Sequence, residues 1–283
     1  MEAIANRSSH ARRQTGRPFS KLFVAIHIIV VLLPIAIVAI WAVADSWSWP
    51  NLLPQELSTR GIEQVLFANR GEGLAVMGQS IGIALATAVL TTIVGALAAR
   101  AVCNHAWVGR TVFNFLLVVP FLIPTTVFAM GVQVLFIQVG VARTVFGVVL
   151  AHSIVALPYA VTIMLDVTRA AGTRLEEAAR TLGASPACTI LHVTLPSLLP
   201  GVLSAMSMSY IMSFSQYFLT LLIGGGAVRT FATVMFPYLS GGDRTIASAY
   251  GILFILATLI VFLIFEALLR RFGLTERKNL FSL

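Results

Sequence analysis

The sequence predicts an all-α polytopic membrane protein with six transmembrane helices and one organised cytoplasmic loop. Of its 283 residues, 58% are hydrophobic and only 11% are charged, whereas soluble domains carry about a quarter charged residues. Its apolar runs are long enough to cross a bilayer, because a helix needs about 20 apolar residues to span about 30 Å of hydrocarbon. Its basic residues are distributed unevenly between these runs. The expected spans are 22–44, 76–99, 111–137, 146–166, 198–223 and 246–269.

The first apolar run, 22–44, follows an arginine-rich start and ends in Ala-Val-Ala, which resembles a signal-peptide cleavage site. The apolar core of a signal peptide is about 7–15 residues long, and this run is much longer. We therefore expect an uncleaved anchor helix, with a cleaved signal peptide as the alternative. The expected organisation is a cytoplasmic tail at 1–21, the first helix with an outer loop at 22–75, a main transmembrane domain at 76–270 and a cytoplasmic tail at 271–283.

Basic residues set the orientation, because Lys and Arg accumulate at the cytoplasmic ends of transmembrane helices. With the N-terminus inside, both termini and the segment 167–197 are cytoplasmic, and the segments 45–75 and 225–245 are outside. A minority of the 19 Lys and Arg residues then lies outside, namely Arg60, Arg70, Arg143, Arg229 and Arg244. The net charge of +8 follows from the cytoplasmic excess, so it does not indicate a nucleic-acid partner.

Enzyme and metal-site motifs do not occur in this sequence. It has no phosphate-binding loop, serine-hydrolase elbow or zinc-protease motif. Its two cysteines, Cys103 and Cys188, form no metal-binding pair. We therefore expect neither an enzyme nor a bound cofactor or metal.

The cytoplasmic segment 167–197 begins with the signals of a short helix. Thr173 can cap this helix, and Glu176 lies three residues later, which completes a Thr-x-x-Glu capping box. Gly183 supplies the left-handed residue that commonly ends a helix. We therefore expect a first short helix between Thr173 and Gly183, followed by a sharp turn.

A second short helix is expected directly after this turn. Ser185 is a favourable N-cap, and Pro186 suits the first helical position, where an N–H group has no partner within the helix. Leu195-Pro196 is expected to end the second helix before the next span, because a proline inside a helix removes a hydrogen bond and clashes with the preceding turn.

The first short helix has one apolar face, with residues at positions i, i+3, i+4 and i+7. This face consists of Leu175, Ala178, Ala179 and Leu182, which we call the alanine ridge. The two alanines keep its profile low. The spacing leaves three interpretations open: the ridge seats in a groove of another protein, it lies on lipid headgroups, or it packs beneath helices of its own subunit.

Fixed residues at fixed spacing in this loop resemble the signature of binding-protein-dependent importer permeases. These are the transmembrane subunits of type I ATP-binding-cassette importers, and they carry a Glu-Ala-Ala loop. The matching residues are Glu177, Ala178, Ala179, Gly183, Val193, Leu195 and Pro196. Val193 replaces the commoner isoleucine, which is a mild departure from the pattern. The signature is specific because it falls in the segment that basic residues independently place in the cytoplasm.

The resemblance extends over residues 76–270. Further similar positions are Pro120 and Pro124, Leu157-Pro158-Tyr159, and Leu199-Pro200-Gly201. Within the family, Leu182-Gly183-Ala184-Ser185 is more similar to the iron, polyamine, thiamine, sulfate and phosphonate importers, because sugar permeases tend to have an aspartate before this glycine.

The resemblance implies a pathway formed by two permease subunits, either identical copies or paralogues, in the bacterial inner membrane. A cytoplasmic ATP-binding-cassette ATPase dimer would hydrolyse ATP, and an extracytoplasmic binding protein would deliver the substrate. The first short helix would be the coupling helix. Glu177 would pair with a basic residue of the ATPase. Gly183 would set the angle between the coupling helix, which acts as a rigid lever, and the span that it moves. The implied coupling residues are Leu175, Glu177, Ala178, Ala179, Leu182, Gly183, Leu195 and Pro196.

Polar residues cluster inside the fifth predicted span, at Ser213, Ser215, Gln216 and Tyr217. Polar groups at this depth face protein or water rather than lipid. We expect them to line the substrate pathway, with hydrogen bonding between helices as the alternative. His152, in the fourth span, is expected to bond to a neighbouring helix rather than to carry protons.

A secondary transporter, or another polytopic membrane protein without an ATPase partner, is the alternative function. Secondary transporters need ionisable residues within the membrane for ion coupling, and they usually show inverted repeats. The predicted spans carry no charge at mid-depth, and the sequence shows no clear repeat. These observations favour the importer permease.

The predicted topology can be tested with single cysteines in a cysteine-free background. We expect Ser58→Cys to react with a membrane-impermeant thiol reagent in intact spheroplasts, because residues 45–75 lie outside. Thr181→Cys should react only after the membrane is permeabilised. Labelling of position 181 but not position 58 in intact cells would invert the topology.

Overall fold

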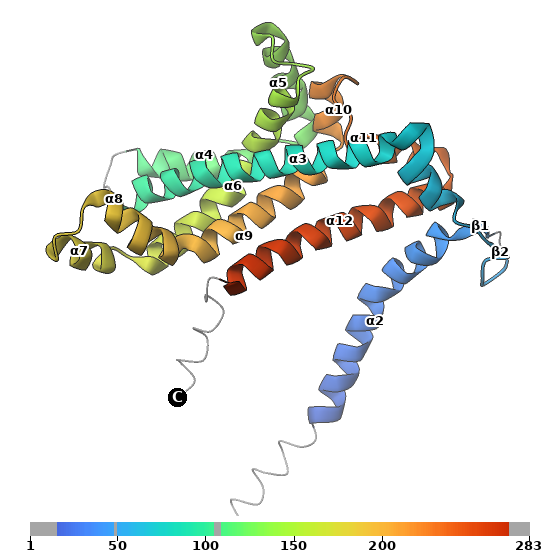
Figure 1. The fold of residues 1–283 in the computed structure, drawn as a ribbon, viewed down its shortest axis with the longest axis horizontal. Helices are drawn as coiled ribbons and strands as arrows, with labels where there is room; N and C mark the ends of the chain where they lie inside the picture. Colours follow the sequence, from blue (N-terminus) through green and yellow to red (C-terminus); the bar gives the residue numbers. More distant parts are fainter. Residues whose placement is uncertain (1–15, 48–49, 105–108, 272–283) are drawn as a thin grey trace, which may run out of the picture. The chain divides into compact units, whose positions relative to one another are not determined.

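The computed structural model describes residues 16–47, 50–104 and 109–271, and most of these residues are α-helical (Figure 1). The predicted tails, 1–21 and 271–283, lie outside the described residues except for the start of α2 and the last residue of α12. The elements are α2 (Gly16–Ala42), β1 (Ala44–Ser46), β2 (Glu56–Leu57), α3 (Arg60–Asn104), α4 (Arg110–Leu122), α5 (Thr125–Val139), α6 (Val145–Ala171), α7 (Arg174–Thr181), α8 (Pro186–Thr189), the π-helix η1 (Ile190–Thr194), α9 (Leu195–Phe214), α10 (Phe218–Gly224), α11 (Phe231–Gly241) and α12 (Arg244–Arg271).

Helices long and apolar enough to cross a membrane account for five of the six predicted spans. They are Leu22–Ala42, Glu72–Asn104, Val145–Ala171, Pro186–Phe214 and Arg244–Leu268. Many of their large apolar side chains are exposed at the surface of the subunit, as expected where lipid is the solvent. The prediction of an all-α, polytopic membrane protein is therefore confirmed.

The remaining predicted span, 111–137, is not one helix. Its residues form α4 and α5, with Ile123 between them in an extended conformation (φ −89°, ψ 125°). Proline disfavours a helical conformation in the residue before it, so Pro124 explains why α4 stops. The prediction of one continuous helix here is wrong.

The predicted fifth span, 198–223, is also interrupted. α9 ends at Phe214, and α10 begins at Phe218. The residues between them are Ser215, Gln216 and Tyr217. The crossing helix instead extends in the other direction, through η1 and α8 to Pro186.

The chain divides into two compact units, and the smaller one comprises Met1–Val65 and Gly242–Ile252. Its two short strands pair antiparallel, so the predicted outer loop, 45–75, contains ordered structure. Arg60 lies 3.4 Å from Asp45 and 3.8 Å from Asp243. The Thr245 hydroxyl donates a 2.6 Å hydrogen bond to the carbonyl of Ala44. These contacts join the strands to the first residues of α3 and α12.

The larger unit comprises Leu66–Gly241 and Leu253–Leu283, and its core forms where α6 packs between α9 and the second half of α3 (Figure 1). Small residues allow these helices to approach closely. A Cβ atom on Gly95 would lie 3.1 Å from the backbone of Ala160, and one on Gly201 would lie 2.8 Å from the Val167 side chain. This core holds in place the helices that carry the loop at 172–185.

Gly201→Ala should destabilise the permease, because the added methyl overlaps Val167. Overpacking of this kind typically costs about 1–3 kcal/mol. Gly78→Ala is the matched control, since no atom of the described residues lies within 4 Å of a Cβ at Gly78. We expect a lower melting temperature in lipid nanodiscs for Gly201→Ala only. Equal melting temperatures for the two variants would contradict this packing.

Candidate functional site

The coupling loop predicted from the sequence contains two short helices joined at Gly183. α7 spans Arg174–Thr181, and Gly183 adopts the predicted left-handed conformation, with φ +87°. The N–H of Gly183 bonds to the carbonyl of Arg180, and the N–H of Ala184 bonds to that of Ala179. This pair of bonds is the Schellman arrangement, so the sharp stop predicted at Gly183 is confirmed.

The start of α7 differs from the prediction, because Thr173 and Glu176 form no capping box. Thr173 has helical rather than extended backbone angles, and its side chain caps no backbone N–H group. Its hydroxyl instead donates to the Glu177 carboxylate at 2.7 Å. The Glu176 carboxylate turns away from the cap toward Arg100, since a guanidinium offers two charge-assisted hydrogen bonds.

Glu176 joins three parts of the chain. Arg100, near the end of α3, donates to both carboxylate oxygens at 2.8 and 3.3 Å. Thr194, the last residue of η1, donates to one of them at 2.6 Å. The Arg100 hydrogen bonds lower the pKa of Glu176 from its usual value, and partial burial opposes them. Glu176 is therefore ionised at neutral pH.

The second short helix begins as predicted but does not end as predicted. Ser185 accepts a hydrogen bond from the Cys188 N–H at 3.3 Å, and Pro186 occupies the first helical turn. The prediction that Leu195-Pro196 ends this helix is wrong, because α8, η1 and α9 follow one another without interruption. The N–H of Leu195 bonds five residues back, to the Ile190 carbonyl. This wider π-turn accommodates a proline that would clash in a regular α-helix.

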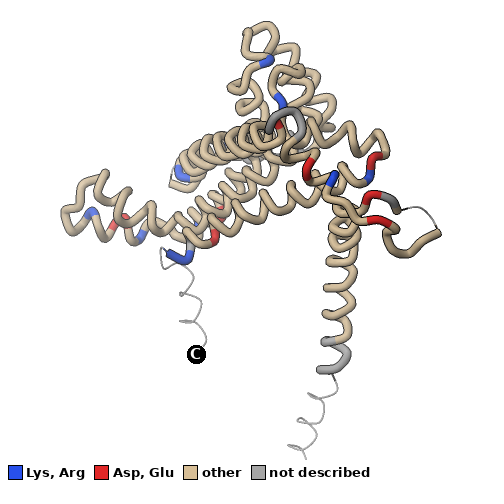
Figure 2. Tube along the Cα trace, turned by 45° about the vertical axis from the view of Figure 1, so that its right-hand side comes forward, with Lys and Arg blue, Asp and Glu red and all other residues tan. Residues whose placement is uncertain are grey.

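The alanine ridge is largely exposed. Leu175 and Leu182 keep 60% and 88% of their surface exposed, Ala178 is exposed and Ala179 is half-buried. Helices of the described chain therefore leave most of the ridge uncovered. Leu195 and Pro196 are also exposed. Figure 2 shows the acidic and basic residues that flank the ridge along α7.

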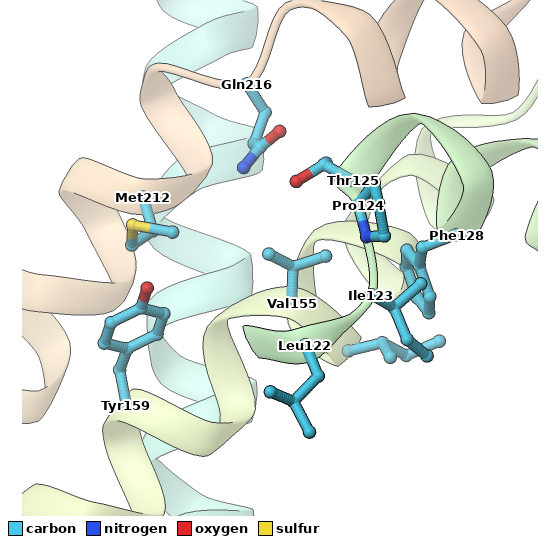
Figure 3. A pocket seen from close by; sticks show the side chains of 10 residues that line it. Leu122, Ile123, Pro124, Thr125, Phe128, Val155, Tyr159, Met212 and Gln216 are labelled. Atoms are coloured by element: carbon cyan, nitrogen blue, oxygen red, sulfur yellow. The ribbon is translucent and has the colours of Figure 1, made fainter. Parts of the chain in front are cut away.

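A cavity of about 460 Å³ lies where α4 gives way to α5, against α6 and the end of α9 (Figure 3). Most of its wall is apolar, and Thr125, Tyr159 and Gln216 bring polar atoms to it. None of the described lining residues is charged. The full lining is Leu122, Ile123, Pro124, Thr125, Phe128, Ile154, Val155, Tyr159, Met212 and Gln216.

The four predicted pathway residues have different surroundings. Gln216 lines the cavity. Ser213 is buried, with its hydroxyl oxygen 2.8 Å from Nδ1 of His152. Ser215, directly after α9, donates to the carbonyl of Ile211 in that helix at 2.9 Å. The ring of Tyr217 stacks on Phe236, with the ring centroids 3.9 Å apart.

His152 bridges the break between α9 and α10. The Thr220 hydroxyl donates to the Gln216 carbonyl at 2.7 Å, so its oxygen accepts the hydrogen bond from Nε2 of His152 at 2.9 Å. Nδ1 lies within hydrogen-bonding distance of the Ser213 hydroxyl, at 2.8 Å. Both ring nitrogens are therefore hydrogen-bonded, and the expectation that His152 bonds to neighbouring helices is confirmed.

Sequence reasoning missed three residues of these arrangements. Arg100 was seen only as a basic residue at a helix end, and Thr194 and Thr220 carried no motif. A signal for Arg100 was present, because an acidic residue in the cytoplasmic loop and a basic residue at the end of a span can form an ion pair, although the sequence does not say which of Glu176 and Glu177 takes this role. Among the described residues, no group of three or more His, Cys, Asp or Glu side chains is placed to hold a metal ion.

Comparison with known proteins gives both sequence and structural relatives. The spermidine/putrescine transport system permease protein PotC of Haemophilus influenzae is 26% identical, over 68% of this chain and 75% of its own. The sulfate transport system permease protein CysT of Salmonella typhimurium is 27% identical, over 67% of this chain and 74% of its own. These names fall within the polyamine and sulfate part of the group that the sequence resembles.

The fold also matches solved structures. A bacterial ABC transporter involved in the import of the acidic polysaccharide alginate aligns with a TM-score of 0.69 at 16% identity, over 90% of this chain and 97% of that chain. Residues 91–274 match the family described as binding-protein-dependent transport system inner membrane component. The chain therefore belongs to this family, and it is a transmembrane permease subunit of an ATP-binding-cassette importer.

Proposed function

We propose that this subunit forms half of a solute pathway and that an ATPase dimer moves it through α7. The second half is another permease subunit, an identical copy or a paralogue, and an extracytoplasmic binding protein delivers the solute. Both termini lie in the cytoplasm of a bacterial cell. The hydrolysis of ATP resides on the ATPase, so this subunit acts as a transporter component and has no catalytic residue.

The exposed alanine ridge carries this proposal. An amphipathic helix whose apolar face is uncovered fits a groove in a partner, and the two alanines let the helix approach closely. Glu177 lies beside the ridge and is exposed, which suits an ion pair with a basic residue of the ATPase. Gly183 then fixes the angle at which α7 meets α8. Leu195 and Pro196 lie at the start of α9.

We further propose that Gln216 contacts the solute in the cavity. Ser213 has a different role: its hydrogen bond to His152 holds the end of α9 in place. The relatives are named for spermidine and putrescine, which are cations, and for sulfate, which is an anion. We infer that this subunit passes a small charged or polar solute of this kind. A mostly apolar wall, with a few polar side chains and no charge among its described lining residues, binds ions of neither sign tightly, so the solute can leave the cavity.

The docking proposal is tested by Ala178→Trp. The added ring should prevent the ridge from seating in the ATPase. Overpacking costs about 1–3 kcal/mol, and about 1.4 kcal/mol is a tenfold change in affinity, so we expect about a tenfold or greater loss of ATPase association. The spans do not depend on α7, so the subunit should insert normally. Co-purification and ATPase stimulation by the loaded binding protein provide the measurements.

Control variants rank the contributions within this loop. Glu177→Ala should weaken association mildly, because it removes one partner of a pair at an interface rim. Gly183→Val should be severe, because a β-branched residue disfavours a left-handed conformation. Thr181→Ser keeps the hydroxyl that donates to the Glu177 carbonyl and should be nearly silent. A fully assembled and active Ala178→Trp complex would refute the docking proposal.

The pathway proposal predicts that Gln216→Leu changes the uptake rate or the ligand preference and leaves ATPase association intact. Ser215→Ala is the matched control, because the Ser215 hydroxyl bonds back to the last turn of α9 and lies outside the cavity lining. Tyr217→Leu should act through the lost stacking on Phe236 and reduce stability. Uptake by reconstituted liposomes distinguishes these effects, and unchanged kinetics in Gln216→Leu would favour a packing role.

A further inference from the structure

We propose that Glu176, Arg100 and Thr194 form a clamp that transmits the movement of α7 to α3 and α9. This inference rests on the proposed docking of α7 to an ATPase, and it assigns Glu176 a positioning role. The neighbouring Glu177 faces the partner, whereas Glu176 holds α7 to its own subunit. We call these three residues the Glu176 clamp.

The clamp joins elements that are distant along the chain. Arg100 and Glu176 are 76 positions apart, and Thr194 lies 18 positions after Glu176. Their contacts connect the first turn of α7 to the end of α3 and to the π-turn before α9. Because one carboxylate accepts from both partners, α7 cannot shift without moving or breaking both contacts.

The environment of the clamp makes it firmer than a surface ion pair. The side chains of Arg100 and Glu176 are 26% and 12% exposed, whereas fully exposed pairs are screened by water and contribute little. The guanidinium engages both carboxylate oxygens, which fixes direction as well as distance. The lowered pKa of Glu176 keeps the carboxylate charged at neutral pH.

Each end of α7 joins its neighbour through a glycine with positive φ. Gly172 precedes α7 with φ +63°, and Gly183 follows it with φ +87°. Apart from the chain next to each glycine, no atom of the described residues lies within 4 Å of a Cβ built on either one, so backbone hydrogen bonds rather than side-chain packing hold these two joints. The Glu176 clamp adds side-chain contacts that connect α7 directly to α3 and to the π-turn before α9.

Glu177 provides the internal comparison. Its carboxylate accepts a hydrogen bond from Thr173, which belongs to the same loop, and its side chain is exposed. Removal of the Glu177 charge should therefore affect the association with the ATPase. Removal of the Glu176 charge should affect the conversion of ATPase movement into transport.

The test compares Glu176→Gln with Glu177→Gln in the complete complex, reconstituted in liposomes with its ATPase and binding protein. For Glu176→Gln we expect normal co-purification of the ATPase and continued ATP hydrolysis. Solute transported per ATP hydrolysed should fall by about tenfold, within the usual range of coupling between sites. Glu177→Gln should weaken co-purification and leave this ratio nearly unchanged. An unchanged ratio in Glu176→Gln would overturn the clamp.

Exchanging the charges of Glu176 and Arg100 distinguishes the loss of their ion pair from a general structural defect. Glu176→Arg and Arg100→Glu should each lower the transport per ATP, and the double variant should restore much of it, because the opposite charges are again paired. Failure of the double variant to improve on both single variants would overturn the clamp. The docking proposal would survive that result if Ala178→Trp still abolished ATPase association.

Discussion

Hydrocarbon around the spans makes every unpaired backbone group costly, and this constraint governs where the chain can stop being helical. The two interruptions, at Ile123 and at Ser215–Tyr217, both end at the same cavity, through Ile123 and Gln216. Backbone groups freed there find partners within the protein, as the Gln216 carbonyl does in Thr220. The two breaks in the helices and the cavity that they border therefore belong to one arrangement.

The sequence predicted the helices well and their interruptions poorly, and the reason is physical. Apolar length is a local property, so hydropathy located the spans. Proline is an ambiguous local signal: Pro158 and Pro200 lie inside continuous helices, whereas Pro124 follows a break. The second break contains no proline. Hydrogen bonds of His152 to Ser213 and Thr220, 61 and 68 positions away, surround this break, and no window along the sequence contains them.

The coupling loop shows the same division between local and distant interactions. Gly183 and Ser185 act on their own backbone neighbours, so their conformations were predictable. The role of Glu176 was mistaken, because a capping box and a contact with Arg100 compete for the same carboxylate and only the second depends on the fold. Pro196 was misjudged for a related reason. A π-turn absorbs the clash that would otherwise end the helix.

Stiffness in this subunit is therefore concentrated at particular points. Gly95 and Gly201 pack tightly against α6, so α3, α6 and α9 behave as one packed group, since close-packed interfaces shift between discrete arrangements rather than bending smoothly. Gly172 and Gly183, both with positive φ, flank α7, and the contacts of Glu176 connect α7 to α3 and to the π-turn before α9. If the proposed clamp operates, a movement of α7 reaches the cavity as a movement of whole helices, and the interrupted segments beside Gln216 are where the chain can change conformation in response.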